Sequence, residues 1–498
     1  MDVLNPMPQA SQRTPVSTID HYTLTTADND QDTIDNELSQ ATVLYVKGKF
    51  RECSEVLKIL CRQHPDNTFA RKYLSRVIFR LLEQQKGAYK FKDLHVEANQ
   101  FRPPILDHAT FVRSVEGRNS PGRGYGVFTT SKVKAGDLLF CEKAFAYSFA
   151  KSAVETQRRL MGSIVEKLSS TPDLIPAFAS LYHDSPTPQV GTNGKPTIDL
   201  HTVERIMALN SFGGSLTTLM SHMAKLDANL EHSSGIWLLA SRINHSCLGN
   251  CRRSFIGDML LVRAAQDIPP DTELLWPYRI PAAKDHDYDA TQVELASYGF
   301  VCSCELCTEA ENATKKVLET RALLRNELLA TFASGQTKAG YDCSSVDTAK
   351  IEKLLAILET TYSSSPIVVP RTGMWDPYLA LTRMYAVLGH PQKVIWAAGK
   401  TLEMLGFLVK GAGASKAADG DEVMIVEKWG LVVDYVVECW MLLWTSFAVL
   451  RDARRAESAL QFAMLSYKIV VGEDETFEDS YGTRGKMCIA EGKLWTDV

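Results

Sequence analysis

A dense cysteine cluster constrains this chain more than any other feature. Cys302, Cys304 and Cys307 lie within six residues. Thiols at this density favour a soft divalent metal, and zinc prefers four ligands in a closed tetrahedral site. The fourth ligand must come from a distant segment, which the metal would tie to this one. The candidates are Cys247, Cys251 and Cys141.

Composition indicates an ordinary globular protein. The chain has 498 residues, which suggests roughly three domains. Hydrophobic residues make up 45% of the chain and charged residues 23%, so most of it can bury a core. The formal net charge of -5 argues against a protein that coats nucleic acid, and we expect no direct nucleic-acid contact.

The N-terminal sequence lacks the charged start and apolar run of a signal peptide. The longest apolar stretch, residues 431–450, is interrupted by Asp434 and Glu438, so it predicts a buried helix and no membrane span. We therefore expect a protein of the cytoplasm, the nucleus or both. In those compartments the eleven cysteines are expected to stay reduced.

Both ends of the chain have helical patterning. Residues 1–32 are polar and are predicted to be a disordered tail. Residues 33–100 have helical apolar stripes broken at Gly48, which suggests a tetratricopeptide-like region or an ordinary helical hairpin. Residues 308–498 are again helical, with helix pairs predicted at 376–408 and 429–471. These ends could bind protein partners.

Between the helical ends, residues 108–307 have the texture of short strands and turns. A helical insertion of about residues 151–232 splits this β-rich region. A hairpin is predicted to turn at Gly257-Asp258, and a strand follows at Glu273–Trp276. The predicted fold class is therefore α+β.

Two polar patterns within this region carry chemistry. Gly122–Phe128 holds three glycines, which let a backbone approach a ligand closely or simply form a turn between strands. Asn244-His245-Ser246-Cys247 gathers many donors and acceptors, and burying them costs free energy unless each finds a partner. A Cys–His hydrolase is disfavoured, because nucleophile and base usually come from distant segments.

These motifs, in this order, resemble the SET domain of protein lysine methyltransferases with its post-SET cysteines at 298–307. The chain is most similar to the SET-and-MYND subgroup, through "LNSFGG" at 209–214 and "YGFVCSCELC" at 298–307. It lacks the cysteines of a MYND finger at residues 150–235, and resembles fungal proteins that combine tetratricopeptide repeats with a SET domain. Gly249 stands where the family usually has proline, which should loosen that turn. Trp276-Pro277 is an uncommon context for the following tyrosine.

The resemblance implies a role for each motif residue. The backbone at Arg123 and Gly124 would hold the methionine end of S-adenosylmethionine. The nucleoside would be bound by Asn244 and His245, with help from Asn210 and with Phe300 against the adenine. Tyr278 and Tyr298 would line the channel for the target lysine, and a structural zinc would be bound by Cys247, Cys302, Cys304 and Cys307.

The implied function is S-adenosylmethionine-dependent methylation of a lysine in a histone or another protein. Aromatic walls suit this chemistry, because an apolar channel disfavours the lysine ammonium and the attacking amine must be neutral. The alternative is an inactive SET scaffold that binds proteins through its helical regions. A further hypothesis concerns the acidic segment 284–289, which follows Tyr278 and could attract basic substrates.

Overall fold

The computed structural model describes residues 26–184, 189–190, 194, 196–224, 232–279, 284–338, 340–413 and 423–496. The chain divides into two compact units, residues 1–81 and residues 82–498. Residues 1–25, most of the predicted disordered tail, lie outside the described residues.

The N-terminal unit is helical. It contains α1 (Thr26–Val46), α2 (Phe50–Gln63) and the first part of α3 (Thr68–Lys86). Gly48 has a φ of +70° in the turn between α1 and α2, where the sequence predicts a break. Leu57 and Cys53 are fully buried, and the Cys53 thiol donates to the carbonyl of Ala41 on the facing helix. The predicted helical hairpin is present, although α1 begins inside the range predicted as a tail.

The larger unit begins with the last residues of α3 and with α4 (Phe91–Gln100), and it is built around an antiparallel sheet. The strand order is β1 (Phe111–Val112), β4 (Leu138–Lys143), β12 (Met259–Ala264) and β11 (Cys251–Ile256). The β11–β12 hairpin turns at Gly257-Asp258 as predicted, with Gly257 at a φ of +55°. Phe140, Leu260 and Val262 are fully buried in one core cluster, and Cys141, Met259 and Leu261 in another, so both faces of the central strands are covered.

Two smaller strand pairs flank the main sheet. β2 (Val115–Ser120) and β3 (Gly124–Thr129) form an antiparallel hairpin around the glycine-rich turn. β10 (Asn244–His245) runs parallel to β13 (Leu275–Trp276), which is shorter than the predicted strand Glu273–Trp276. This parallel pairing brings the Asn-His-Ser-Cys segment beside the chain that leads into Tyr278.

The predicted helical insertion contains strands as well as helices. Its helices are α5 (Ala153–Ser170), α6 (Ile175–Ala179), α7 (Leu200–Asn210) and α8 (Thr218–Ala224). β8 (Phe212–Gly214) is the edge of a sheet with β9 (His232–Ile236) and β5 (Ala146–Ala150). β6 (Gln189–Val190) pairs with β7 (Pro196–Thr197). The rest of the polar loop at 183–199 lies largely outside the described residues. The insertion therefore extends the β-rich region through β8, which the helical prediction missed.

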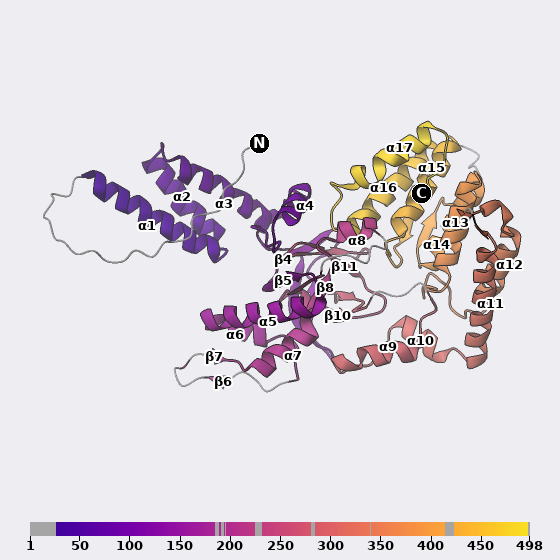
Figure 1. Cartoon of the computed structure of the whole chain (residues 1–498), viewed down its shortest axis with the longest axis horizontal. Coiled ribbons are helices and arrows are strands. Elements are labelled where there is room, and N and C mark those ends of the chain that lie inside the picture. The colour runs from indigo at the N-terminus through magenta and orange to yellow at the C-terminus, as the bar shows by residue number, and fades with distance from the viewer. Residues whose placement is uncertain are drawn as a thin grey trace. The chain divides into compact units, whose positions relative to one another are not determined.

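The C-terminal part is helical. After α9 (Tyr288–Leu295) and α10 (Glu305–Asn312) come α11 (Lys315–Ala333), α12 (Thr348–Glu359), α13 (Trp375–Val387), α14 (Pro391–Met404), α15 (Val436–Val449), α16 (Ala453–Val471) and α17 (Thr483–Ala490). Two short hairpins interrupt them, β14 (Gln336–Thr337) with β15 (Gly340–Tyr341) and β16 (Leu408–Lys410) with β17 (Ile425–Lys428). Figure 1 shows α13–α17, orange to yellow, gathered in one body. The two predicted helix pairs correspond to α13–α14 and α15–α16.

Hydrogen bonds from the main sheet and from α8 hold this helical body in place. The Arg263 guanidinium on β12 donates to the carbonyl of Gly472, just after α16 (2.7 Å). His222 on α8 accepts from or donates to the Tyr481 hydroxyl (2.9 Å). The apolar segment 431–450 forms α15, which is 14 residues long, and no helix among the described residues is long and apolar enough to cross a membrane.

Candidate active site and metal centre

Four cysteine side chains converge from two distant segments. The sulfurs of Cys247, Cys302, Cys304 and Cys307 all lie within 4.8 Å of one another. The Cys247 sulfur is 3.9 Å from that of Cys302 and 3.7 Å from that of Cys307. Zinc–sulfur bonds of ~2.3 Å in a tetrahedron would separate the sulfurs by ~3.8 Å, so this geometry fits a metal ion.

The other two candidates for the fourth ligand lie elsewhere. Cys251 is buried on β11, and its sulfur faces the carbonyl of Leu275 at 3.5 Å. Cys141 is fully buried on β4, in a core cluster with Tyr89.

Within the four-cysteine cluster, burial raises the pKa of the Cys307 thiol, so its thiolate needs a nearby cation.

Side-chain contacts fix the closing segment around the cysteines. The Gln292 side chain on α9 donates to the carbonyl of Cys302 and accepts from its amide, both at 2.9 Å. The Nε2 atom of His286 is 3.2 Å from the Cys307 sulfur. The cysteine spacing alone did not identify either residue.

His245 connects the cysteine cluster to Tyr278. The Tyr278 backbone amide donates to Nδ1 of His245 (3.0 Å), so we assign the ring proton to Nε2. Nε2 lies 3.4 Å from the Cys247 sulfur and can donate to it. Burial lowers the pKa of His245 to about 4, which keeps the ring neutral at physiological pH. Both ring nitrogens are thus engaged within the protein, and the side chain that sequence reasoning gave to the nucleoside serves here as a bridge.

Tyr278, Tyr298 and Phe300, which the resemblance gave to the lysine channel and the adenine, lie together in one aromatic cluster. The Tyr278 ring lies 4.9 Å from that of Tyr298 and 6.2 Å, edge-on, from that of Phe300. The Tyr278 hydroxyl donates to the carbonyl of Ile243 (3.3 Å). Burial raises the pKa of Tyr278, so its hydroxyl stays protonated at neutral pH and acts as a dipole, not as a base.

The glycine-rich turn lies beside Asn244. Gly124 has a φ of +77°, and the space that a Cβ would occupy there is open. The Asn244 amide donates to the carbonyl of Tyr125 (3.2 Å) and to Glu273 (2.8 Å). The exposed Arg123 guanidinium lies 3.8 Å from the other oxygen of Glu273. Glu273 was not identified from the sequence; it joins the turn, Asn244 and the strand before Tyr278.

Asn210 is held by its own surroundings at the end of α7. Its side-chain amide donates to the carbonyls of Tyr182 and Ile206, both at 2.8 Å. Its backbone carbonyl accepts from the Ser241 hydroxyl (3.1 Å), three residues before Asn244. Among the described residues, no hydrogen bond joins Asn210 to the turn or to Asn244.

A buried carboxylate supports the segment that leads to Asn244. The two Glu142 oxygens accept from the backbone amides of Leu239 and Ala240 at 2.8 and 2.9 Å. Burial raises the pKa of Glu142 to about 7, although these amides lower it. In the sequence, Glu142 is a single acidic residue in the β-rich region, and no motif or spacing identified it as part of the site.

The departure at Gly249 has a structural cause. A Cβ on residue 249 would lie 2.8 Å from the Leu275 carbonyl oxygen, 2.8 Å from the Trp276 Cα and 2.9 Å from the Pro277 ring. The expectation that glycine loosens this turn stays a prediction, but the structure shows a steric reason for glycine at this position. Glycine lets the chain that leads into Tyr278 pack closely, so Gly249 and Trp276-Pro277 fit one another.

The acidic segment 284–289 is engaged in structural contacts. Asp285 accepts from the Tyr362 hydroxyl, and Asp287 caps α9 by accepting from the amide of Ala290 (3.0 Å). The Lys284 carbonyl accepts from Thr372 (2.8 Å). These contacts tie the segment to the C-terminal part, which weakens the hypothesis of a free acidic surface.

Comparison with known families agrees with this geometry. Residues 124–279 match the family model of the SET domain, a range that includes Gly124, Asn244, Cys247 and Tyr278. The chain contains a SET domain.

Three fungal relatives also match. A protein from Gibberella zeae named "Methyltransferase" is 36% identical over 471 residues, which cover 88% of this chain and 63% of that relative. The histone-lysine N-methyltransferase set5 of Schizosaccharomyces pombe is 26% identical, over 40% of this chain and 52% of its own length. The histone-lysine N-methyltransferase SET5 of Eremothecium gossypii is 37% identical, over 16% of each chain. The chain thus spans less than two thirds of the length of these relatives.

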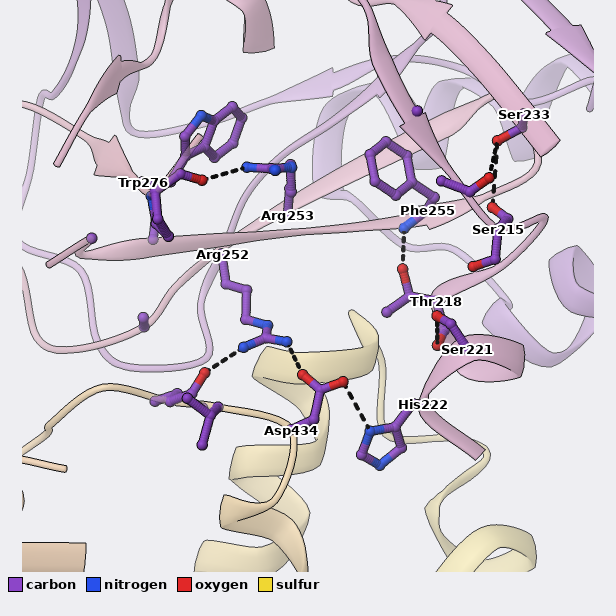
Figure 2. Close-up of a pocket in the computed structure, with 18 of the residues that line it drawn as sticks. Ser215, Thr218, Ser221, His222, Ser233, Arg252, Arg253, Phe255, Trp276 and Asp434 are labelled. Carbon is purple, nitrogen blue, oxygen red and sulfur yellow. Dashed lines mark hydrogen bonds and ion pairs between the residues drawn. The ribbon is translucent and has the colours of Figure 1, made fainter. Parts of the chain in front are cut away.

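A cavity of about 830 Å³ lies between the SET domain and the C-terminal helices. Strands β8, β9 and β11 and residues Trp276 and Pro277 line one side, and residues 431–438 line the other. Figure 2 shows Arg252 reaching Asp434, whose second oxygen faces His222. The sequence did not predict this cavity, because its two walls are 180 residues apart.

Proposed function

We propose that this protein transfers a methyl group from S-adenosylmethionine to the side-chain amine of a lysine in a protein. The observation that carries the proposal is the aromatic cluster of Tyr278, Tyr298 and Phe300, joined through His245 to the cysteine cluster within a SET domain. A scaffold would not need a protonated tyrosine hydroxyl between apolar rings.

The open glycine-rich turn suits the cofactor. The backbone at Arg123 and Gly124 would hold the methionine end, because the turn leaves free space where any other residue would place a Cβ. Asn244 would hold the nucleoside from a position already fixed by Glu273. His245 and Asn210 would contribute through their backbone and position, and Phe300 would lie against the adenine. When bound, S-adenosylmethionine supplies an activated methyl group on a sulfonium centre.

The lysine channel would be lined by Tyr278 and Tyr298. Free lysine has a pKa near ~10.4, so its amine must lose a proton before it can attack. Apolar ring faces disfavour the ammonium form. Since the Tyr278 hydroxyl donates to Ile243, its lone pairs remain free to accept from the amine and aim it. Alignment of this kind can lower the activation free energy by ~7–11 kcal/mol.

We propose zinc as the metal of the four-cysteine cluster, in a structural role. The metal would join the segment at Cys247 to that at 302–307, and His245 and His286 would each donate a hydrogen bond to a ligand sulfur. The zinc would then hold in place both the tyrosines of the lysine channel and the segment that binds the cofactor.

The names of two relatives suggest histones as a substrate class, and we propose a histone or another protein of the nucleus or cytoplasm. The resemblance to the SET-and-MYND subgroup and to tetratricopeptide regions stays part of this proposal. The competing function is an inactive scaffold that binds partners through its helices. The changes at Gly249 and Pro277 motivated it, but their mutual fit removes that motive.

Titration of isotope-labelled S-adenosylmethionine onto the full chain separates the two functions. We expect saturable binding that Asn244→Ala weakens at least tenfold. Asn312→Ala is the matched control, since the Asn312 amide donates only to the carbonyl of Thr308 on an exposed helix. Absence of binding to the folded, zinc-loaded wild type would favour the scaffold.

A further inference from the structure

Arg253 is a cation in the wall of the cavity between the SET domain and the C-terminal helices. Its guanidinium donates to the carbonyl of Pro277 (3.2 Å). It also lies over the Trp276 ring at 5.1 Å and near the Phe212 ring at 5.6 Å. Figure 2 shows it reaching toward the chain at Trp276. Among the described residues, no carboxylate lies within ion-pair distance of it.

Charged groups on both walls of the cavity have partners. Arg252 pairs with Asp434 and donates to the carbonyl of Val432. Glu438 accepts from the Nε atom of Arg383 at 2.6 Å. Arg253 thus differs from its neighbour on the same strand, because most of its five N–H donors remain available.

A partly buried guanidinium without an anion costs free energy to keep. The two aromatic rings offset part of that cost, but cation–π contacts do not use the N–H donors. If the only role of Arg253 were to stack on Trp276, a carboxylate of the protein could also pair with it, as Asp434 pairs with Arg252. Arg253 lines a cavity of about 830 Å³, which is large enough for part of a polypeptide.

We propose that this cavity is a subsite for an acidic side chain of the substrate polypeptide, with Arg253 as the group that binds its carboxylate. The inference rests on the proposed lysine methylation. Arg253 would then determine specificity by favouring substrates with Asp or Glu close to the target lysine.

The position of Arg253 explains why the acid would be near the lysine. Pro277, whose carbonyl accepts from Arg253, directly precedes Tyr278 of the lysine channel. Gly213 and Gly214 of β8 also line the cavity, and β8 is the edge strand of its sheet. An edge strand offers backbone groups to an extended peptide, so a polypeptide suits this wall better than a small free anion.

The test uses the full chain and fluorescent heptapeptide libraries with a central lysine. There are three libraries for each flanking position, in which that position is Glu, Gln or Lys and the other flanking positions are random. Binding is measured by fluorescence anisotropy with S-adenosylhomocysteine present. We expect the best Glu library to bind about tenfold more tightly than its Gln counterpart, as for one charge-assisted hydrogen-bonded pair.

Arg253→Gln should abolish that tenfold preference and leave the affinity for the Gln library unchanged, because glutamine can still donate to Pro277. Arg205→Gln is the control: it removes the same charge from α7, where Arg205 pairs with Asp184 outside the cavity. It should keep the preference. Melting temperature and zinc content establish that each variant is folded.

Several results would overturn the subsite. The first is an equal affinity of the wild type for the Glu and Gln libraries. The second is a preference for Glu that persists in Arg253→Gln. The third is displacement of the peptides by free glutamate at the same concentration. Methyl transfer to the same libraries is measured separately. Transfer without a Glu preference removes this inference alone, and Glu-selective binding without transfer removes the proposed activity alone.

Discussion

At the scale of single residues, the Tyr278 hydroxyl is the group that would act on the reacting amine. It is held by Ile243, and burial raises its pKa. We expect Tyr278→Phe to lower kcat by roughly 10- to 100-fold, which corresponds to the loss of one hydrogen bond of ~1.5–3 kcal/mol. The dissociation constant of S-adenosylmethionine should change less than twofold. Steady-state kinetics and equilibrium binding on the same preparation test this, and a parallel loss of affinity would place the hydroxyl at the cofactor instead.

Also at the scale of single residues, the buried Glu142 carboxyl should make the free energy of unfolding depend on pH. Its folded-state pKa of about 7 lies above the ordinary value of 4.5, so it binds a proton more tightly in the folded state. Its contribution to stability is full below about pH 4.5 and is lost as the pH rises to about 7. The free-energy advantage of the wild type over Glu142→Gln should therefore shrink by up to ~3 kcal/mol over this window. Denaturant unfolding at pH 4.5, 6 and 8 measures it; an advantage that grew with pH would contradict it.

At the scale of elements, the tight approach of residue 249 to the chain at 275–277 determines where Tyr278 lies. Gly249→Ala would put a Cβ within 3 Å of three backbone or ring atoms. Overpacking of this kind costs ~1–3 kcal/mol, and moving Tyr278 should also lower kcat. Gly162→Ala on α5 is the control, since its Cβ would meet nothing within 4 Å. If thermal melting and kinetics were unchanged in Gly249→Ala, the proposed fit with Trp276-Pro277 would be wrong.

The cysteine cluster joins two elements, and its loss should affect both. Cys302→Ser should lower zinc content from about one ion per chain and lower the melting temperature, because metal binding is coupled to folding. Cys343→Ser changes a thiol outside the cluster and should alter neither quantity. Elemental analysis after gel filtration, with a melting curve, gives both quantities. A metal-free wild type that methylates at full rate would remove the structural role.

At the scale of the whole molecule, the sequence predicted what local patterns can specify. The helix pairs, the hairpin at Gly257-Asp258 and the three clustered cysteines were found because periodicity, turn residues and thiol spacing are local signals, whereas spacing left the fourth cysteine open and only the resemblance indicated Cys247. β8 was missed because its three residues carry no alternation and owe their strand geometry to β9.

The remaining parts of the site depend on contacts between distant segments. Glu273, Gln292 and Glu142 each act through backbone groups or side chains brought in by the tertiary fold. The role of His245 followed from its two ring partners, which no spacing reveals. Resemblance located the motif residues, but the direction in which each side chain points required the structure.

The central claim is methyl transfer to lysine, and one measurement tests it most directly. The full chain is incubated with methyl-labelled S-adenosylmethionine and with histones or a cell extract, and labelled residues are mapped by tandem mass spectrometry. The account predicts label on lysine side-chain nitrogens, at a level that Tyr278→Phe reduces at least tenfold and Cys343→Ser leaves unchanged. Label on other residue types, or no label from protein that binds the cofactor and contains zinc, would contradict it.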